Sequence, residues 1–258
     1  MLTIDKYLRP STLEEAYEAA QKKNSVVLGG MLWLRLANKR VSTAIDLSAL
    51  GLEYVTEDED FWHIGAYTTL RTLETHEALN NMTGNLFRDA LKAIVGVQFR
   101  NLATAGGSVF GRFGFSDVVT ALLALDASVV LYKTGALSLE DFCRMGKVND
   151  ILTEIRIPKT PVHTAYFAQR NTATDFPVLN VCAAERKETI TIVVGARPLG
   201  GTVYRFSAAE TAENMAERIA GDAVFTGNTR ASAEYRRHLC RVLVKRAVDE
   251  IMAEREGI

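Results

Sequence analysis

The sequence predicts an α+β fold in two parts, and three observations indicate it. Short apolar runs typical of buried strands alternate with amphipathic helical segments in the first part of the chain. Three strand-like runs followed by two helical segments make up the last part. Between the two parts, Pro158-Lys159-Thr160-Pro161 interrupts regular structure, because proline lacks the backbone N–H that a ladder requires. We therefore predict one domain over 1–160 and a second over 161–258.

The elements of the first part follow from local signals. Ser11-Thr12-Leu13-Glu14 is a capping box, which predicts the start of a helix with one apolar face. A short helix is expected to begin at Ser138. The other expected strands are Val26–Leu28, Thr43–Leu47, Phe61–Ala66, Ser128–Tyr132 and Ile151–Pro158, and the other expected helices are Leu32–Asn38, Thr69–Leu79, Leu86–Val95 and Val118–Leu125.

The second part predicts strands near 163–170, 178–185 and 189–196, then helices near 208–220 and 232–253. In the last helix one apolar stripe is expected, with the Arg and Lys side chains on the other face. The stripe consists of Tyr235, Leu239, Val242, Leu243 and Ala247.

Composition is that of an ordinary soluble globular protein: 258 residues, 48% hydrophobic and 24% charged. The formal net charge of −1 does not indicate a nucleic-acid or anionic-membrane partner. No segment approaches the roughly 18 apolar residues of a membrane span, and the first residues lack the apolar core of a signal peptide. We therefore expect a cytoplasmic protein without a membrane span.

The reactive side chains show no metal-binding or catalytic spacing. Cys143, Cys182 and Cys240 are isolated, so spacing predicts neither an iron–sulfur cluster nor a zinc site, and we expect buried free thiols. The four histidines are scattered, and no Ser/His/Asp arrangement is visible. We expect no metal site and no catalytic acid or base in this chain.

Two glycine segments carry the strongest functional signal. The run Val26–Trp33 enters Gly29-Gly30 from a strand, and Gly106-Gly107 lies between hydroxyl side chains. Glycine has no Cβ to hold a phosphate away from the backbone, so such segments expose N–H groups to an anion. Downstream, Ser116-Asp117 begins an apolar helix, whose positive dipole end and carboxylate suit an anion and a sugar hydroxyl.

With both segments in view, the chain resembles the FAD-binding subunit of the molybdenum hydroxylases, the family of xanthine dehydrogenase and carbon monoxide dehydrogenase. The resemblance rests on Leu28–Met31, Phe99–Ser108, Ser116-Asp117 and Ala121–Ala127 and covers nearly the whole chain. It implies a two-part FAD-binding domain of the vanillyl-alcohol-oxidase/PCMH type over 1–160. The region 161–258 is then the family's small sheet-plus-helices C-terminal domain.

The resemblance also implies a set of FAD-binding residues. The pyrophosphate is expected between two backbone segments, Leu28, Gly29, Gly30, Met31, Leu32, Trp33 and Leu34 on one side and Thr104, Ala105, Gly106, Gly107 and Ser108 on the other. Thr104 and Ser108 are expected to add hydroxyl donors. Asp117 is expected to bind the ribose of the adenosine, a role compatible with that of an ordinary acid in the first turn of a helix.

Four further residues are implied near the flavin ring. Ile94 and Leu152 match apolar contacts to the flavin, although a core position explains each of them nearly as well. Asp175 and Phe176 match an acid followed by a bulky side chain at the isoalloxazine edge, where the bulky group can gate nicotinamide access.

Several residues depart from the family's pattern. Ser108 stands for the usual Asn, Met31 for the usual Thr, and Ala168 for the usual Lys, which Arg170 can replace. The segment 111–115 brings a cation and two aromatic rings that can stack on adenine. These departures leave the wrapping of the phosphates by backbone intact and alter contacts to the flavin ring.

The resemblance therefore implies an electron-transfer subunit of a xanthine dehydrogenase-like complex. Electrons are expected to pass from [2Fe–2S] centres in a small partner subunit, through FAD in this chain, to NAD or another acceptor. The substrate is expected to be oxidised on a molybdopterin-binding large subunit. Two alternatives remain: a stand-alone FAD oxidoreductase, and a family-derived assembly or binding protein that has lost its flavin.

Overall fold

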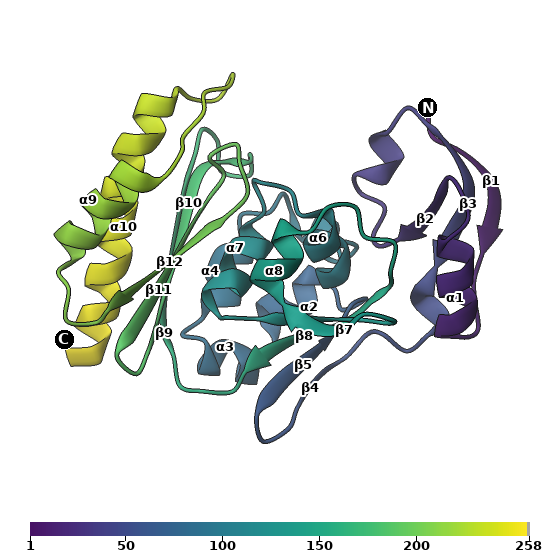
Figure 1. The fold of residues 1–258 in the computed structure, drawn as a ribbon, viewed down its shortest axis with the longest axis horizontal. Helices are drawn as coiled ribbons and strands as arrows, with labels where there is room; N and C mark the ends of the chain where they lie inside the picture. The colour runs from purple at the N-terminus through teal and green to yellow at the C-terminus, as the bar shows by residue number, and fades with distance from the viewer. Residues whose placement is uncertain (257–258) are drawn as a thin grey trace. The chain divides into compact units, whose positions relative to one another are not determined.

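The computed structural model describes residues 1–256, which form two compact units (Figure 1). Unit 1 consists of Met1–Thr72, Val97–Gly111 and Ala127–Ile157. Unit 2 consists of Leu73–Gly96, Arg112–Asp126 and the described chain from Pro158 onward. The α+β prediction is confirmed, whereas the division at residue 160 stays a prediction, because unit 2 also takes two segments from before that point.

Unit 1 contains two sheets and several short helices. Its elements in chain order are β1 (Thr3–Leu8), α1 (Leu13–Ala20), β2 (Ser25–Leu28), η1 (Leu34–Leu36), β3 (Arg40–Asp46), η2 (Leu47–Ala49), β4 (Val55–Glu57), β5 (Phe61–Gly65), the start of α2 (Leu70–Thr75), α5 (Val97–Arg100), α6 (Ala105–Gly111), β6 (Ser128–Leu131), β7 (Gly135–Ser138), α8 (Leu139–Arg144) and β8 (Leu152–Pro158).

The two sheets of unit 1 differ in strand direction. The first is parallel, with the order β1-β3-β2, and Leu28 at the end of β2 pairs with Asp46 of β3. The second has the order β4-β5-β8-β6-β7, with antiparallel pairing of β4 with β5 and of β6 with both β7 and β8. Helix α1 packs its alanine face, Ala16 and Ala19, on the core beside Ile45 of β3.

Three local expectations need correction. The first helix begins one residue later than expected: Thr12 is its N-cap and accepts a hydrogen bond from the Glu15 N–H, while the Glu15 carboxylate accepts from Ser11 N. The helix expected over 32–38 is only the single 3₁₀ turn η1. The helix expected over 69–79 is divided at His76, because its ring nitrogen caps a new helix by accepting from Leu79 N.

Unit 2 is a helix-covered antiparallel sheet. Its elements are α3 (Glu77–Met82), α4 (Leu86–Leu91), α7 (Asp117–Ala124), β9 (His163–Arg170), β10 (Pro177–Arg186), β11 (Thr189–Gly195), β12 (Thr202–Ser207), α9 (Ala212–Asp222) and α10 (Ala233–Glu256). The strand order is β12-β11-β10-β9. The predicted strands β9, β10 and β11 are confirmed within two residues. The short strand β12 at the sheet's edge was not predicted.

Both faces of the unit 2 sheet are covered. Helices α9 and α10 lie along one face, and α7 and α4 contact the other (Figure 1). Strand β10 is therefore buried from Pro177 to Glu185. A strand buried on two sides reads as a continuous apolar run, which is why the sequence identified this strand readily.

The stripe predicted for the last helix is partly wrong. Leu239, Leu243 and Ala247 are buried, but Tyr235 is 45% exposed, and Arg236, expected on the polar face, is fully buried. Its guanidinium donates only to neutral acceptors, among them the carbonyls of Val178 (2.8 Å) and Thr226 (2.7 Å). Hydrogen bonds to these fixed oxygens make the burial of its charge tolerable.

No helix in the described part of the chain combines the length and the apolar character that crossing a membrane requires. Cys182 and Cys240 are buried free thiols as expected, and Cys143 is half-buried.

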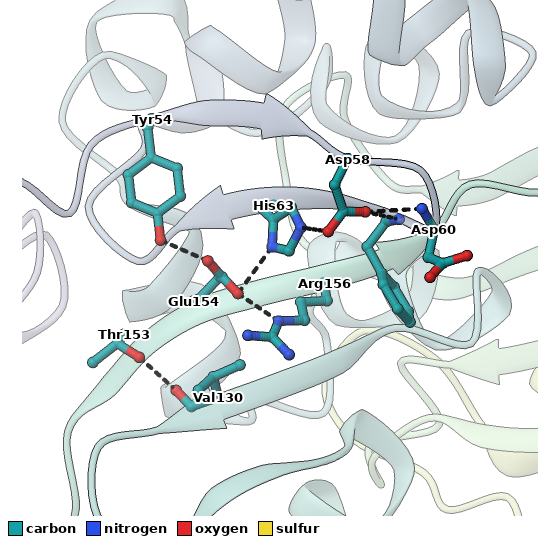
Figure 2. Close-up of polar contacts among 9 residues, drawn as sticks. Tyr54, Asp58, Asp60, His63, Val130, Thr153, Glu154 and Arg156 are labelled. Atoms are coloured by element: carbon teal, nitrogen blue, oxygen red, sulfur yellow. Dashed lines mark hydrogen bonds and ion pairs between the residues drawn. The ribbon is translucent and has the colours of Figure 1, made fainter.

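A histidine lies between two carboxylates on the second sheet of unit 1 (Figure 2). His63 of β5 contacts Asp58 through Nε2 (2.8 Å) and Glu154 of β8 through Nδ1 (3.1 Å), and its side chain is 18% exposed. Burial alone lowers the pKa of His63, but hydrogen bonds to both carboxylates outweigh burial and raise it above its ordinary value. The hydrogen bond from His63, with those from Phe61 N and Asp60 N, lowers the pKa of Asp58 to about 2.

We predict that His63 stabilises unit 1 at mildly acidic pH. A raised folded-state pKa means that this stabilisation is fully present below the unfolded pKa of about 6.5 and is lost as pH rises through the folded pKa. His63→Gln should therefore lower the free energy of unfolding more at pH 5.5 than at pH 9, measured by urea denaturation. His238→Gln, on the exposed face of α10, is the control. A His63→Gln effect that does not change with pH would contradict the prediction.

Candidate functional site

The first glycine segment follows the end of β2 in unit 1. The Tyr67 hydroxyl donates to the Leu28 carbonyl and accepts from Leu47 N (3.0 Å), which fixes the ends of β2 and β3 together. After Gly29 and Gly30 the chain turns at Met31, whose φ of 58° lies in the left-handed region that non-glycine residues rarely adopt. Such strain is typical of segments whose backbone has a functional geometry.

The two glycine segments contact each other through backbone. A Cβ on Gly30 would lie 1.9 Å from the carbonyl oxygen of Leu102, and one on Gly29 would lie 2.8 Å from Thr104 Oγ1 and 3.3 Å from Gly107 Cα. No side chain larger than a hydrogen fits at Gly30 without moving backbone. The two glycine segments therefore contact each other within unit 1, and that they hold a pyrophosphate between them stays a prediction.

The second segment is the first turn of helix α6, not an open loop. Its N–H groups bond inside the protein: Ala105 donates to Thr68 O (2.8 Å), Gly106 to Ala66 O (2.8 Å) and Gly107 to Thr104 Oγ1 (3.1 Å). Ser108 directs both its N–H and its hydroxyl to Thr104 O, at 3.0 and 2.9 Å. The backbone N–H groups of this segment are therefore already bonded within the protein. What it can offer a ligand is the Thr104 hydroxyl proton and, at its glycines, room for close approach to the backbone.

The first segment keeps its donors available. Within residues 1–256, the N–H groups of Gly30, Met31, Leu32 and Leu34 donate to no protein atom, while the carbonyls of Met31 and Leu34 accept from the turn that follows. Unused N–H groups that lie close together in the chain beside a glycine pair can donate to an anion. The structure thus separates two roles that the sequence assigned equally to both segments.

Asp117 is the first residue of α7 in unit 2 and is 5% exposed. Its Oδ1 accepts from the Tyr166 hydroxyl and from Asn180 Nδ2 (3.2 Å), and Arg170 Nη2 lies 2.8 Å away. Burial, and then the neighbouring Asp117 charge, raise the pKa of Tyr166 well above its ordinary value. No residue in the described chain donates to Asp117 Oδ2, so this oxygen remains able to accept from a sugar hydroxyl.

The sequence did not identify these partners of Asp117. Tyr166, Arg170 and Asn180 come from strands β9 and β10, which are distant in sequence from α7. Arg170 was considered only as a replacement for the lysine missing at position 168. The available signal was an acid at the start of a largely apolar helix, because a carboxylate buried there requires donors from neighbouring elements.

Asp175 and Phe176 lie in unit 2 just before β10. Asp175 Oδ1 accepts from Phe176 N (2.7 Å), and Arg170 Nη1 donates to the Asp175 carbonyl (2.6 Å). Arg230, which the sequence did not identify, places Nη2 3.1 Å from Asp175 Oδ1 and its Cζ 5.0 Å from the Phe176 ring centroid. The hydrogen bond from Arg230, followed by that from Phe176 N, lowers the pKa of Asp175.

The two apolar candidates occupy different environments. Leu152 of β8 in unit 1 is 5% exposed. Ile94 of unit 2 is half-buried in the turn after α4, beside Val95, whose φ of 49° is strained for a β-branched residue. Their contact with a flavin stays a prediction. No group of three or more side chains able to hold a metal ion occurs within residues 1–256.

Comparison with known proteins identifies the family to which the chain is similar. A family model described as the FAD binding domain in molybdopterin dehydrogenase matches residues 2–160. A second, described as the CO dehydrogenase flavoprotein C-terminal domain, matches residues 205–251.

The matching proteins include two curated relatives and one solved structure. The nicotinate dehydrogenase FAD-subunit of Eubacterium barkeri is 29% identical over 178 residues, covering 62% of this chain and 60% of that one, so the match spans less than two thirds of that relative. The nicotine 6-hydroxylase medium subunit of Paenarthrobacter nicotinovorans is 26% identical over 277 residues, covering 95% and 96%. Quinoline 2-oxidoreductase from Pseudomonas putida 86 matches in fold, with a TM-score of 0.85 at 15% identity over 97% of this chain and 96% of that one.

We predict that Gly30→Ala destabilises unit 1, because the added methyl group meets the Leu102 carbonyl at 1.9 Å. Overpacking of this kind costs about 1–3 kcal/mol, which lowers the melting temperature by about 2–10 °C in a chain of this size. Gly146→Ala in the same unit is the matched control, since a Cβ there meets nothing within 4 Å. Equal melting temperatures for the two variants, measured by circular dichroism, would contradict the close approach of the two segments.

Proposed function

The chain belongs to the family of FAD-binding subunits of molybdopterin-dependent dehydrogenases, and on that premise we propose that it is the flavoprotein subunit of a xanthine dehydrogenase-like oxidoreductase complex. One observation carries the proposal. The N–H groups of Gly30, Met31, Leu32 and Leu34 are unused by the described protein, and Gly30 lies against the Leu102 carbonyl. Backbone donors of this kind suit the pyrophosphate of a dinucleotide.

The residues present fit FAD. The donors of Gly30, Met31, Leu32 and Leu34 would hold phosphate oxygens, and the Thr104 hydroxyl would add one more donor. That Asp117 of unit 2 binds the ribose is a proposal that rests on the family resemblance alone. Met31 lacks the hydroxyl of the usual Thr, and Ser108 is shorter than the usual Asn. Neither change removes a backbone donor. The fit therefore favours a flavin-loaded protein over a relative that has lost its flavin.

The chain's own part in the reaction is placement. When bound, FAD supplies the chemistry that accepts electrons singly from iron–sulfur centres and delivers them in pairs to an acceptor. The residues of this chain bind and orient the cofactor, and no acid or base of the chain is assigned to substrate oxidation. We propose that [2Fe–2S] centres of a small subunit and a molybdopterin-binding large subunit complete the complex, with NAD or another acceptor, in the cytoplasm.

A stand-alone FAD oxidoreductase is the competing function. Such an enzyme requires a substrate site with its own acid, base or hydroxyl donor. In unit 2 the polar groups near Asp117 and Asp175 are engaged with one another through Arg170 and Arg230. This mutual engagement favours a structural and cofactor-positioning role for these groups.

We predict that the isolated chain prefers FAD to FMN. The unused donors of unit 1 address the pyrophosphate, which FMN lacks. Titration followed by flavin fluorescence should give an affinity for FAD at least about 100-fold higher, as expected for the loss of two or three hydrogen bonds to charged groups. Equal affinity for the two flavins would exclude this mode of binding.

We also predict that the chain alone, loaded with FAD, reduces no NAD⁺ when purines or N-heterocycles are supplied. In the proposed complex, electrons reach the flavin from iron–sulfur centres of a partner subunit. Reduction of NAD⁺, or of a dye if NAD⁺ is not the acceptor, should appear only after a [2Fe–2S] subunit and a molybdopterin subunit are added. Turnover by the chain alone would instead support the stand-alone oxidoreductase.

A further inference from the structure

We propose that Tyr67 is a positioning residue for the pyrophosphate of FAD. Its hydroxyl fixes the peptide through which the chain enters the first glycine segment, and this keeps the unused N–H groups that follow in one arrangement. The inference rests on the proposed function in one respect, namely that these N–H groups bind the pyrophosphate. The contacts that carry it all lie within unit 1.

The Tyr67 hydroxyl joins the ends of two parallel strands. It donates to the carbonyl of Leu28, the last residue of β2, and accepts from Leu47 N (3.0 Å). Asp46 Oδ1 lies 3.2 Å from the same hydroxyl oxygen, and Asp46 of β3 pairs with Leu28. Burial, as the main cause, raises the pKa of Tyr67 well above its ordinary value, so the hydroxyl keeps its proton at neutral pH.

Fixing the Leu28 carbonyl fixes the whole peptide that it belongs to. The peptide that joins Leu28 to Gly29 is planar, so a bound carbonyl oxygen also sets the direction in which Gly29 begins. Glycine has more backbone freedom than any other residue type, so Gly29 and Gly30 do not keep this direction by themselves. At the other end of the pair, Arg35 N donates to the Met31 carbonyl (3.0 Å). The glycines therefore lie between two fixed points, and Tyr67 supplies the first.

The neighbours of Tyr67 in the chain contact the second glycine segment. The carbonyls of Ala66 and Thr68 accept from Gly106 N and Ala105 N, both at 2.8 Å. These are backbone bonds, which a substitution of the Tyr67 side chain leaves in place. Loss of the Tyr67 hydroxyl therefore releases the first segment and keeps the second bound, so its effect on a ligand can be assigned to the first segment.

Two other tyrosines of unit 1 provide matched controls. Tyr54, half-buried like Tyr67, donates to Glu154 Oε2 (2.8 Å), which lies outside both glycine segments. Tyr7, an exposed residue, donates to Asp46 Oδ2. Tyr54→Phe therefore reports the general loss of a half-buried tyrosine hydroxyl. Tyr7→Phe reports any effect that passes through the Asp46 carboxylate instead of the Leu28 carbonyl.

The first test is a titration of the flavin-free full chain with FAD and with FMN, followed by flavin fluorescence. Tyr67→Phe should weaken FAD binding about tenfold and FMN binding less than about threefold, because the pyrophosphate of FAD requires several aligned donors. Tyr54→Phe and Tyr7→Phe should bind FAD within about twofold of the parent chain. Equal losses for FAD and FMN in Tyr67→Phe, or an equal loss of FAD binding in either control, overturn the inference.

The second readout is amide hydrogen exchange over residues 29–34, measured by mass spectrometry at saturating FAD. In the parent chain FAD should slow this exchange about tenfold, because the unused N–H groups gain acceptors. In Tyr67→Phe the slowing should fall to about threefold or less, whereas Tyr54→Phe should keep it. Slowing as large as in the parent overturns the inference even where the affinity of Tyr67→Phe has fallen.

The outcomes separate the inference from the proposed function. If Tyr67→Phe does not fold, 4-fluorophenylalanine in place of Tyr67 fills the position of the hydroxyl without donating. The same loss of FAD affinity, about tenfold, is then expected, and an unchanged affinity overturns the inference. A parent chain that binds no FAD refutes the proposed function and the inference with it. A parent chain that binds FAD, with Tyr67→Phe equal to it in both readouts, refutes the inference alone.

Discussion

The close approach of two backbone segments is the constraint on which the rest of unit 1 depends. Gly30 meets the Leu102 carbonyl at a distance that leaves no room for a Cβ, so the first segment can carry no side chain at that position. Tyr67 fixes the end of β2, and the bonds of Ala105 and Gly106 to Thr68 and Ala66 fix the start of α6. Because α6 uses its own N–H groups, the donors left for an anion are those of the first segment.

In unit 2 the organising feature is a chain of charged groups that alternate in sign. Asp117, Arg170, Asp175 and Arg230 contact one another in that order, beginning at a buried carboxylate and ending at a half-buried guanidinium. Two acids that the family resemblance assigns to different parts of the cofactor therefore belong to one network. Their positions are fixed by the protein before any ligand binds, which is the physical meaning of a preorganised site.

Local sequence signals predicted the elements whose environment is simple. The strand β10, buried on both faces, and the helices begun by Ser116 and Ser138 were found because continuous apolar runs and capping hydroxyls are unambiguous. The edge strands β1 and β12 were missed, since neither is a continuous apolar run. The helix expected after Gly30 became a single turn, and the capping box acts one residue later than its pattern indicates.

By itself the sequence determined the family, the α+β class and the two glycine segments, because each depends on residue types at short spacing. Only the tertiary structure decided which N–H groups stay unused, that Asp117 is enclosed by Tyr166, Arg170 and Asn180, and that Arg236 is buried. The physical reason is the same in each case. A hydrogen bond is satisfied by whichever partner the fold brings within reach, and those partners lie on elements distant in the chain, where local periodicity carries no information.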